Sequence, residues 1–167
     1  MDWVSGEPVF FHDDVLYIRV NPELKEIDLP QLEWVAGTLK ISSNDLMTSV
    51  QIPSLRQLGA GLYVSFSESC REVSLPVEEI HGFLYLQNTS LTSFSLPELT
   101  RVGTNAAVNH NQLLETLSFP LLAHVGGVFD VRDNPELPTS AVDDLIGAIG
   151  EGNIAGQIFN SGNGSGR

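Results

Sequence analysis

The sequence predicts an all-β protein, a parallel β-solenoid of about six coils whose C-terminal end is closed by a short helix. Two observations predict this fold. Apolar and polar residues recur in the same order every 22 or 23 residues, which is the mark of a stacked repeat. Each repeat also contains a short segment in which apolar residues alternate with others, the pattern of a strand with one buried face.

The alternating segment supplies two apolar columns. The first column is Leu16, Leu39, Leu62, Leu84, Ala106 and Phe129, and the second is Ile18, Ile41, Val64, Leu86, Val108 and Val131. Residues two apart point to the same face of a strand, so both columns belong to the inward face. Because one such strand cannot bury that face alone, we expect successive copies to stack about 4.8 Å apart around a shared core.

A column of small polar side chains follows the strand in every repeat. Its members are Asn21, Asn44, Ser67, Thr89, Asn111 and Asn134. Side chains of this kind bond to backbone groups at tight corners. We interpret the column as a structural polar ladder that joins each coil to the next.

The second half of the repeat contains a proline and, six or seven residues later, a glycine. Proline suits the residue after a strand end, where its missing N–H is harmless. The glycine column, which we interpret as the bend before the next strand, is Gly37, Gly59, Gly82, Gly103 and Gly126.

These features predict one domain over residues 1–161. Residues 1–15 form an N-terminal cap, residues 16–138 the repeats, and residues 139–161 a C-terminal cap. Within that last cap a helix begins near Thr139 and ends at Gly150, and Ile158 and Phe159 add a short strand. We expect residues 162–167, which are rich in glycine, to form a flexible tail.

Composition excludes several classes of function. The chain has 21 acidic and 8 basic residues and a net charge of −13, the opposite of what a protein needs to bind a phosphate backbone, so nucleic acid is not expected as a partner. No apolar stretch approaches the 18 residues of a membrane span, so direct membrane insertion is not expected. The single cysteine, Cys70, excludes an intrachain disulfide and is interpreted as a buried structural thiol.

No arrangement of residues predicts catalysis or a metal or cofactor site. The four histidines occupy unrelated positions of the repeat, so stacking does not bring them together as ligands. Asp130 and Asp133 are close in sequence, but Ala107 and His110 occupy the same positions on the preceding coil. We therefore expect a protein that is not an enzyme, without a metal or cofactor.

The outward positions of the strand are the best candidates for a binding site. One row reads Tyr17, Lys40, Tyr63, Tyr85, Ala107 and Asp130, and the next reads Arg19, Ser42, Ser65, Gln87, Asn109 and Arg132. Stacked tyrosines beside arginine and polar side chains are typical of a protein or glycan contact surface. The predicted ligand-binding residues are Tyr17, Arg19, Lys40, Tyr63, Tyr85, Gln87 and Arg132. Ordinary cross-strand pairing on an exposed sheet is the alternative reading of the same rows.

The repeat resembles the receptor L-domain superfamily. The resemblance is clearest in LEWVAGTLKISSNDL at residues 32–46 and in LAHVGGVFDVRDN at residues 122–134, and it covers about residues 16–160. It implies a right-handed, single-stranded parallel β-helix, and a module of a larger protein that is secreted or displayed at the cell surface. The chain lacks the flanking cysteines of receptor members. Leucine-rich repeats of the bacterial surface type are similar in length and motif and are the nearest alternative.

These observations predict a non-enzymatic binding or adhesion module that contacts a protein or a glycan through the exposed sheet. Two alternatives stay open. One is a passive structural spacer, and the other is a carbohydrate-active β-helix enzyme with Asp130 in its site.

Overall fold

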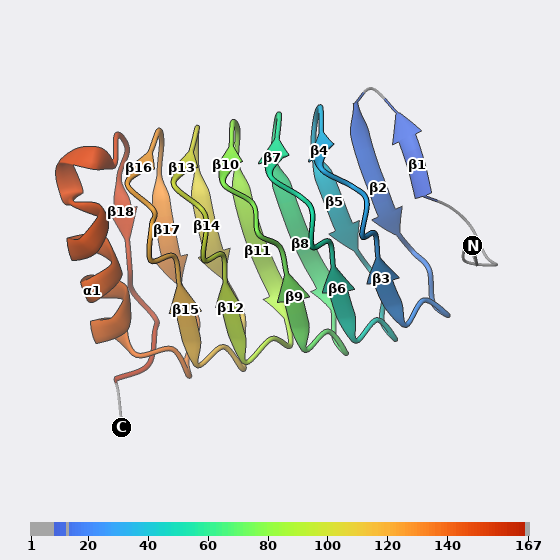
Figure 1. Cartoon of the computed structure of the whole chain (residues 1–167). Helices are drawn as coiled ribbons and strands as arrows, with labels where there is room; N and C mark the ends of the chain where they lie inside the picture. Colours follow the sequence, from blue (N-terminus) through green and yellow to red (C-terminus); the bar gives the residue numbers. More distant parts are fainter. Residues whose placement is uncertain (1–8, 13, 166–167) are drawn as a thin grey trace.

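A computed structural model describes residues 9–12 and 14–165 and confirms the predicted β-solenoid (Figure 1). Its largest sheet has eight strands, of which all but the first are parallel. In spatial order they are β1 (Val9–His12), β2 (Val15–Arg19), β5 (Leu39–Ser42), β8 (Leu62–Ser67), β11 (Leu84–Thr89), β14 (Ala106–Asn109), β17 (Phe129–Arg132) and β18 (Ile158–Phe159).

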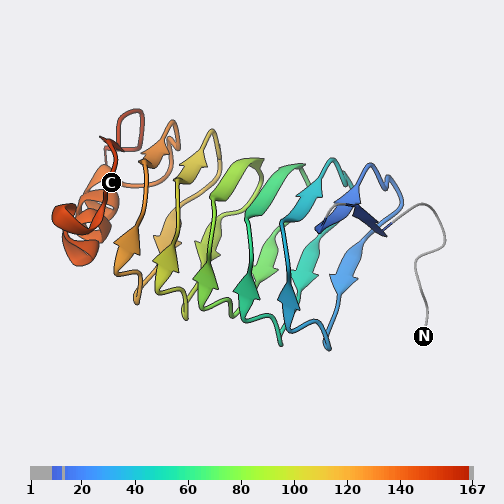
Figure 2. The ribbon, with the colours of Figure 1, turned by 90° about the horizontal axis from the view of Figure 1, so that it is seen from above.

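Shorter strands form the other sides of the coils, which are stacked along one axis in Figure 2. A five-stranded sheet contains β4 (Trp34–Val35), β7 (Gln57–Leu58), β10 (Glu79–Ile80), β13 (Arg101–Val102) and β16 (His124–Val125). A three-stranded sheet contains β3 (Glu26–Asp28), β6 (Ser49–Gln51) and β9 (Glu72–Ser74), and a two-stranded sheet contains β12 (Ser93–Ser95) and β15 (Thr116–Ser118).

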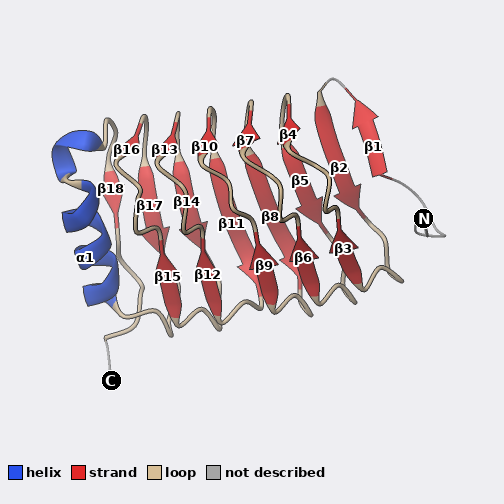
Figure 3. Ribbon diagram, in the orientation of Figure 1, coloured by secondary structure: helices blue, strands red, loops and turns tan. Residues whose placement is uncertain are grey.

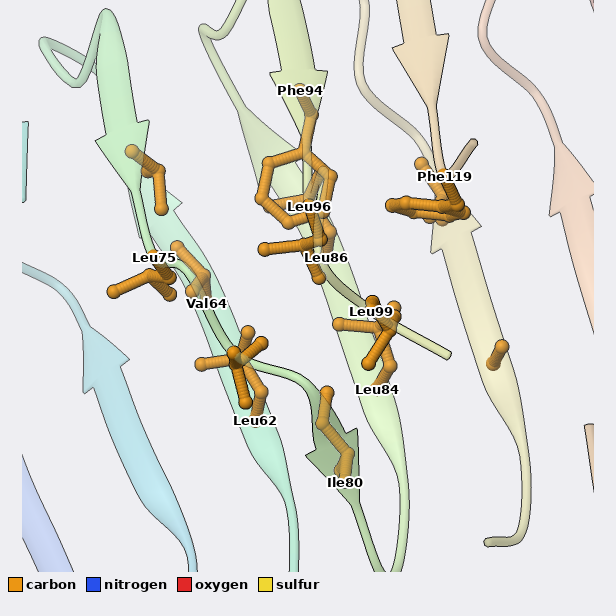
Figure 4. Close-up of a cluster of buried hydrophobic side chains, with 14 of the residues drawn as sticks. Leu62, Val64, Leu75, Ile80, Leu84, Leu86, Phe94, Leu96, Leu99 and Phe119 are labelled. Carbon is orange, nitrogen blue, oxygen red and sulfur yellow. The ribbon is translucent and has the colours of Figure 1, made fainter. Parts of the chain in front are cut away.

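The two predicted apolar columns lie in register inside the solenoid. Leu62 pairs with Leu39 on one side and Leu84 on the other, and Val64 pairs in the same way with Ile41 and Leu86. No member of either column is more than 2% exposed. Figure 4 shows Leu62, Val64, Leu84 and Leu86 beside Ile80 of β10 and beside Leu96 and Leu99, which lie between β12 and β13. Each fully buried aliphatic side chain contributes roughly 1.5–3 kcal/mol, so this shared core holds the coils together.

The polar column forms hydrogen bonds between coils. Asn44 Oδ1 accepts bonds from the backbone nitrogen and the Nδ2 of Asn21, at 3.1 and 3.2 Å, and Asn44 Nδ2 donates to the Ile18 carbonyl. Asn111 Oδ1 accepts from the backbone nitrogen and the hydroxyl of Thr89, at 3.1 and 2.8 Å. The side chain of Ser67 lies outside the described part of the structure.

A left-handed residue precedes each member of the polar column. The residues are Val20, Ser43, Phe66, Asn88, His110 and Asp133, with φ between 48 and 58°. This conformation turns the chain sharply at the end of the long strand. It is costly for most side chains, and a β-branched residue such as Val20 is a clear outlier.

The glycine column lies at the bend before the next long strand, as predicted, but a left-handed backbone is not what requires glycine there. Among the described glycines only Gly150 and Gly162 have a positive φ. In the column, a Cβ on Gly59 would collide with the carbonyl oxygen of Ala36 and would lie 2.7 Å from its carbonyl carbon. Glycine therefore stands here because consecutive coils approach too closely for a side chain.

The C-terminal cap begins with helix α1 (Thr139–Ile149), which covers the end of the stack (Figure 3). Val142, Leu145, Ile146 and Ile149 form its buried face. Gly150, with φ of 83°, ends the helix as predicted and donates its N–H to the Ile146 carbonyl. A 3-10 turn, η1 (Glu151–Asn153), then leads to β18.

The last described residues add a further coil where we expected a flexible tail. Gly164 accepts a bond from the Thr139 nitrogen and donates to the Leu137 carbonyl. Asn163 bonds to Asn134 and extends the polar ladder. Of the predicted tail, residues 166–167 lie outside the described structure, as do residues 1–8 and 13 of the predicted N-terminal cap.

Two further features concern the core and the surface. Cys70 is fully buried, and its thiol lies 3.7 Å from the Glu72 carbonyl oxygen. Within the described residues, no helix is both long and apolar enough to cross a membrane.

Candidate functional site

The outer face of the eight-stranded sheet differs in charge from the whole chain. Its strands carry three basic residues, Arg19, Lys40 and Arg132, and one acidic residue, Asp130, a formal charge of +2. The chain as a whole has a charge of −13. A random distribution of 21 acidic and 8 basic residues would make this face acidic, so its composition distinguishes it from an ordinary solvated surface.

Each basic residue on this face lies over an aromatic ring. The guanidinium carbon of Arg19 is 5.4 Å from the ring centre of Tyr17, and Lys40 Nζ is 4.6 Å from that of Tyr63. The guanidinium of Arg132 is 5.0 Å from the ring centre of Phe159. Such cation–π contacts are worth about 0.5–1 kcal/mol at exposed sites and restrict the motion of the long basic side chains.

Aromatic side chains gather on the central strands. Tyr63 and Tyr85 are in register on β8 and β11, and their rings meet edge to face at 6.4 Å. The Phe83 ring lies 4.7 Å from that of Tyr85. Gly61 leaves room for Phe83, because a Cβ there would lie 2.7 Å from that ring. The result is a supported aromatic cluster, which we define as Tyr63, Phe83 and Tyr85.

A hollow of about 450 Å³ lies beside this cluster, over β11, β14, β17 and β18. Ala107 lies between Tyr85 and Asp130 in the outer row, and Phe159 follows Asp130. The small side chain of Ala107 therefore leaves a gap between larger neighbours. The hollow is lined by Tyr85, Gln87, Asn105, Ala107, Asn109, Val128, Asp130, Arg132 and Phe159.

The polar residues of the hollow are joined to one another. Gln87 Nε2 lies 3.4 Å from Asn109 Oδ1, and Asn109 Nδ2 donates to Asp130 Oδ2 at 3.0 Å. Arg132 Nε forms an ion pair with Asp130 Oδ1 at 3.0 Å. A network of this kind holds its members in fixed positions before any ligand arrives.

Asp130 is the most buried charge in this network, with its side chain 12% exposed. Burial raises the pKa of this carboxyl group, and the neighbouring Arg132 guanidinium opposes that rise. The Asp130 carboxylate contacts Arg132 and Asn109, and these two contacts fix the positions of both side chains.

The sequence-predicted residues lie on one face. Tyr17, Lys40, Tyr63 and Tyr85 are in register on the consecutive strands β2, β5, β8 and β11, and Tyr85 also lines the hollow. Gln87 and Arg132, also predicted, line that hollow.

Sequence reasoning missed part of this site. It did not choose Phe83, Asn105, Asn109, Asp130 or Phe159 as ligand-binding residues. Phe83 and Asn105 stand one position before the strand's first inward residue, on the same face as the predicted rows, and the period of two could have identified them. Phe159 belongs to the same outer row, but α1 and η1 interrupt the repeat before it, so the repeat period alone does not identify it.

The lining side chains of the hollow can donate and accept hydrogen bonds and can stack against a ring. Hydrolysis of a glycosidic bond commonly uses two carboxyl groups on either side of the bond. Asp130 is the one carboxyl group among the described lining residues. In residues 9–12 and 14–165, no three His, Cys, Asp or Glu side chains gather in a group that could hold a metal ion.

Two fungal proteins are similar to this chain. Protein ecm33 of Aspergillus fumigatus is 30% identical over 113 residues, which are 67% of this chain and 27% of that protein. A protein of Arthroderma benhamiae named as a cell surface GPI-anchored protein is 26% identical over 128 residues, which are 76% of this chain and 30% of that protein. The chain thus spans less than a third of the length of these relatives.

No family model matches the chain, and no solved structure matches it significantly. The β-solenoid that the receptor L-domain resemblance implied is present, but membership of that superfamily is not shown by these comparisons.

Proposed function

We propose that the chain is a non-catalytic binding module of a larger fungal cell-surface protein, and that it contacts its ligand through the outer face of the eight-stranded sheet. The observation that carries this proposal is the composition of that face. It concentrates aromatic and basic side chains on a strongly acidic chain, and it contains a preformed hollow. Aromatic and arginine side chains are enriched where proteins bind partners.

The surface location rests on the relatives. One of them is named as a cell surface GPI-anchored protein, and the same location is the simplest for a module with a related sequence. The receptor L-domain resemblance supports the same reading, because members of that superfamily are modules of larger surface proteins.

A passive spacer is the second candidate. A spacer requires the stacked core and the polar ladder. It does not need a hollow, or a face whose charge is opposite to that of the whole chain. The regular coil-to-coil bonds would serve either role, so the outer face alone discriminates between them.

The test is binding of the labelled chain to fungal cell walls, measured for three proteins. The double variant Tyr63→Ala/Tyr85→Ala removes the aromatic cluster, and Trp34→Ala removes an exposed aromatic from the five-stranded sheet as a matched control. We expect the double variant to bind at least about tenfold more weakly, because truncating an aromatic side chain at the centre of an interface commonly costs more than about 1 kcal/mol of binding free energy. Trp34→Ala should bind like the unsubstituted chain. Equal binding by all three proteins would remove the face from the proposal, and no binding by the unsubstituted chain would favour the spacer.

A further inference from the structure

The hollow is the part of the outer face whose chemistry is most specific. It combines two aromatic rings, two aliphatic side chains and five polar side chains in about 450 Å³, a volume within the usual range of small-molecule sites. A protein partner would cover about 800 Å² of surface and would extend beyond this hollow, whereas a short, slender ligand can be held within it.

The aromatic wall is Tyr85, and it is supported from behind. Tyr63 meets its ring from the preceding coil, and Phe83 packs against it over Gly61 of that same coil. The hollow lies on the opposite side, over the following coils. A ring fixed in this way offers a flat apolar surface against which a pyranose ring can stack at little cost in side-chain entropy.

The polar wall favours hydroxyl groups. Asn109 supplies an amide that both donates and accepts, Asp130 supplies an acceptor, and Arg132 has four N–H donors in addition to the Nε that bonds to Asp130. Amide, carboxylate and guanidinium groups can each bond to neighbouring hydroxyls of one ring. Their mutual bonds hold them at fixed spacings along the coil axis.

The balance of charge favours an uncharged ligand. Asp130 and Arg132 neutralise each other inside the hollow, so a charged ligand would have to compete with one of them for the other. Tyr85 and Phe159 stand three coils apart in the row, about 14 Å at the spacing of parallel strands, so the hollow is longer than one sugar ring.

We propose that the hollow between Tyr85 and Phe159 binds a neutral oligosaccharide, with one pyranose ring stacked on Tyr85 and hydroxyl groups along the oligosaccharide bonded to Asn109, Asp130 and Arg132. This inference rests on the proposed function, since it names the ligand class of that face. Phe159 acts beneath Arg132 and keeps the guanidinium in place.

The test measures calorimetric binding of neutral gluco-, manno- and chito-oligosaccharides, with an acidic oligosaccharide as comparison. Ala107→Phe fills the hollow, and Ala107→Ser leaves it open at the same position. We expect at least one neutral ligand to bind, about tenfold loss in Ala107→Phe and in Tyr85→Ala, and a smaller loss in Ala107→Ser than in Ala107→Phe. Trp34→Ala, on the five-stranded sheet outside the proposed face, should change binding less than about twofold. Retained thermal unfolding of each variant shows that the fold is intact, and Tyr85→Ala tests the site even if Ala107→Phe does not fold.

Different failures have different meanings. Binding that Ala107→Phe and Tyr85→Ala leave unchanged, or a preference for the acidic oligosaccharide, would overturn the glycan site. If the chain binds cell walls through Tyr63 and Tyr85 but protease treatment of the walls abolishes that binding, the ligand is a protein: the proposed function stands and the inference falls. Absence of binding both to walls and to every oligosaccharide would overturn both.

Discussion

Asn163 Oδ1 accepts hydrogen bonds from the backbone nitrogen and the Nδ2 of Asn134, both at 3.2 Å. Asn44 and Asn111 accept an equivalent pair of bonds from the coil before each of them. The ladder therefore continues past helix α1 into a final coil, which places Phe159 beside β17 and completes the hollow.

Loss of this last ladder residue should loosen the final coil. Asn163→Ala removes the acceptor for Asn134 and the donor to the Val131 and Asn160 carbonyls. Leaving such groups unpaired costs about 1–3 kcal/mol, so we expect a drop of about 2 kcal/mol in the free energy of unfolding. Urea unfolding measures it. Asn160→Ala, which removes an exposed bond to Asp143, is the control and should cost less than about 1 kcal/mol; equal effects would argue against the ladder.

Close approach of the coils makes the glycine column sensitive to a single methyl group. Gly59→Ala would force a Cβ into the Ala36 carbonyl, and we expect a loss of stability of about 3 kcal/mol or more from overpacking. Gly147 lies in α1, where a Cβ would meet nothing within 4 Å, so Gly147→Ala should raise stability by about 0.5–1 kcal/mol. Thermal unfolding of the two variants should shift in opposite directions. A stabilising Gly59→Ala would show that the coils are farther apart.

The left-handed corner before the ladder is strained at Val20, with φ of 55° and the side chain mostly exposed. Asparagine tolerates this conformation better, and Asn88 already occupies the equivalent corner. Val20→Asn should therefore stabilise the protein by about 0.5–1 kcal/mol, and Asn88→Val should destabilise it by a similar amount. Chemical unfolding of both variants checks the pair, and a destabilising Val20→Asn would contradict the assigned backbone conformation.

Burial raises the pKa of the Cys70 thiol to about 11. The folded protein holds this proton more tightly than the unfolded chain, whose thiol has a pKa of about 8.5. The corresponding stability is complete below about pH 8.5 and is lost as the pH rises towards about 11. Cys70→Val lacks this thiol, so the two proteins should differ in how their unfolding free energy falls over that range. Parallel pH profiles would contradict the prediction.

Most of the fold was predictable because its signal is periodic. Leu39, Leu62 and Leu84 recur at a fixed interval, and burial requires all of them to face the same core. The glycines were predicted to lie at the bend before the next strand, and they do, but the sequence did not show that close approach of the coils is what requires glycine there. Only coordinates reveal which carbonyl lies above Gly59.

The candidate site was predictable in part. Tyr85, Gln87 and Arg132 follow from the alternation of the strand. The hollow does not, since it depends on Ala107 being smaller than its neighbours and on Phe159 arriving from beyond α1. The segment of α1 and η1 does not repeat, so the 22- or 23-residue period stops before Phe159.

The most direct measurement of the central claim, that the outer face of the eight-stranded sheet is the binding surface, is a nuclear magnetic resonance titration. The side-chain amides of Gln87 and Asn109 report on the hollow, and those of Gln51 on β6 and Gln57 on β7 report on the other sheets. With soluble neutral oligosaccharides from fungal cell walls as the probe, we predict concentration-dependent shifts at Gln87 and Asn109 while Gln51 and Gln57 remain unchanged. Shifts confined to Gln51 or Gln57 would contradict the central claim, and no shift at any of the four amides at saturating probe would contradict the neutral-oligosaccharide inference.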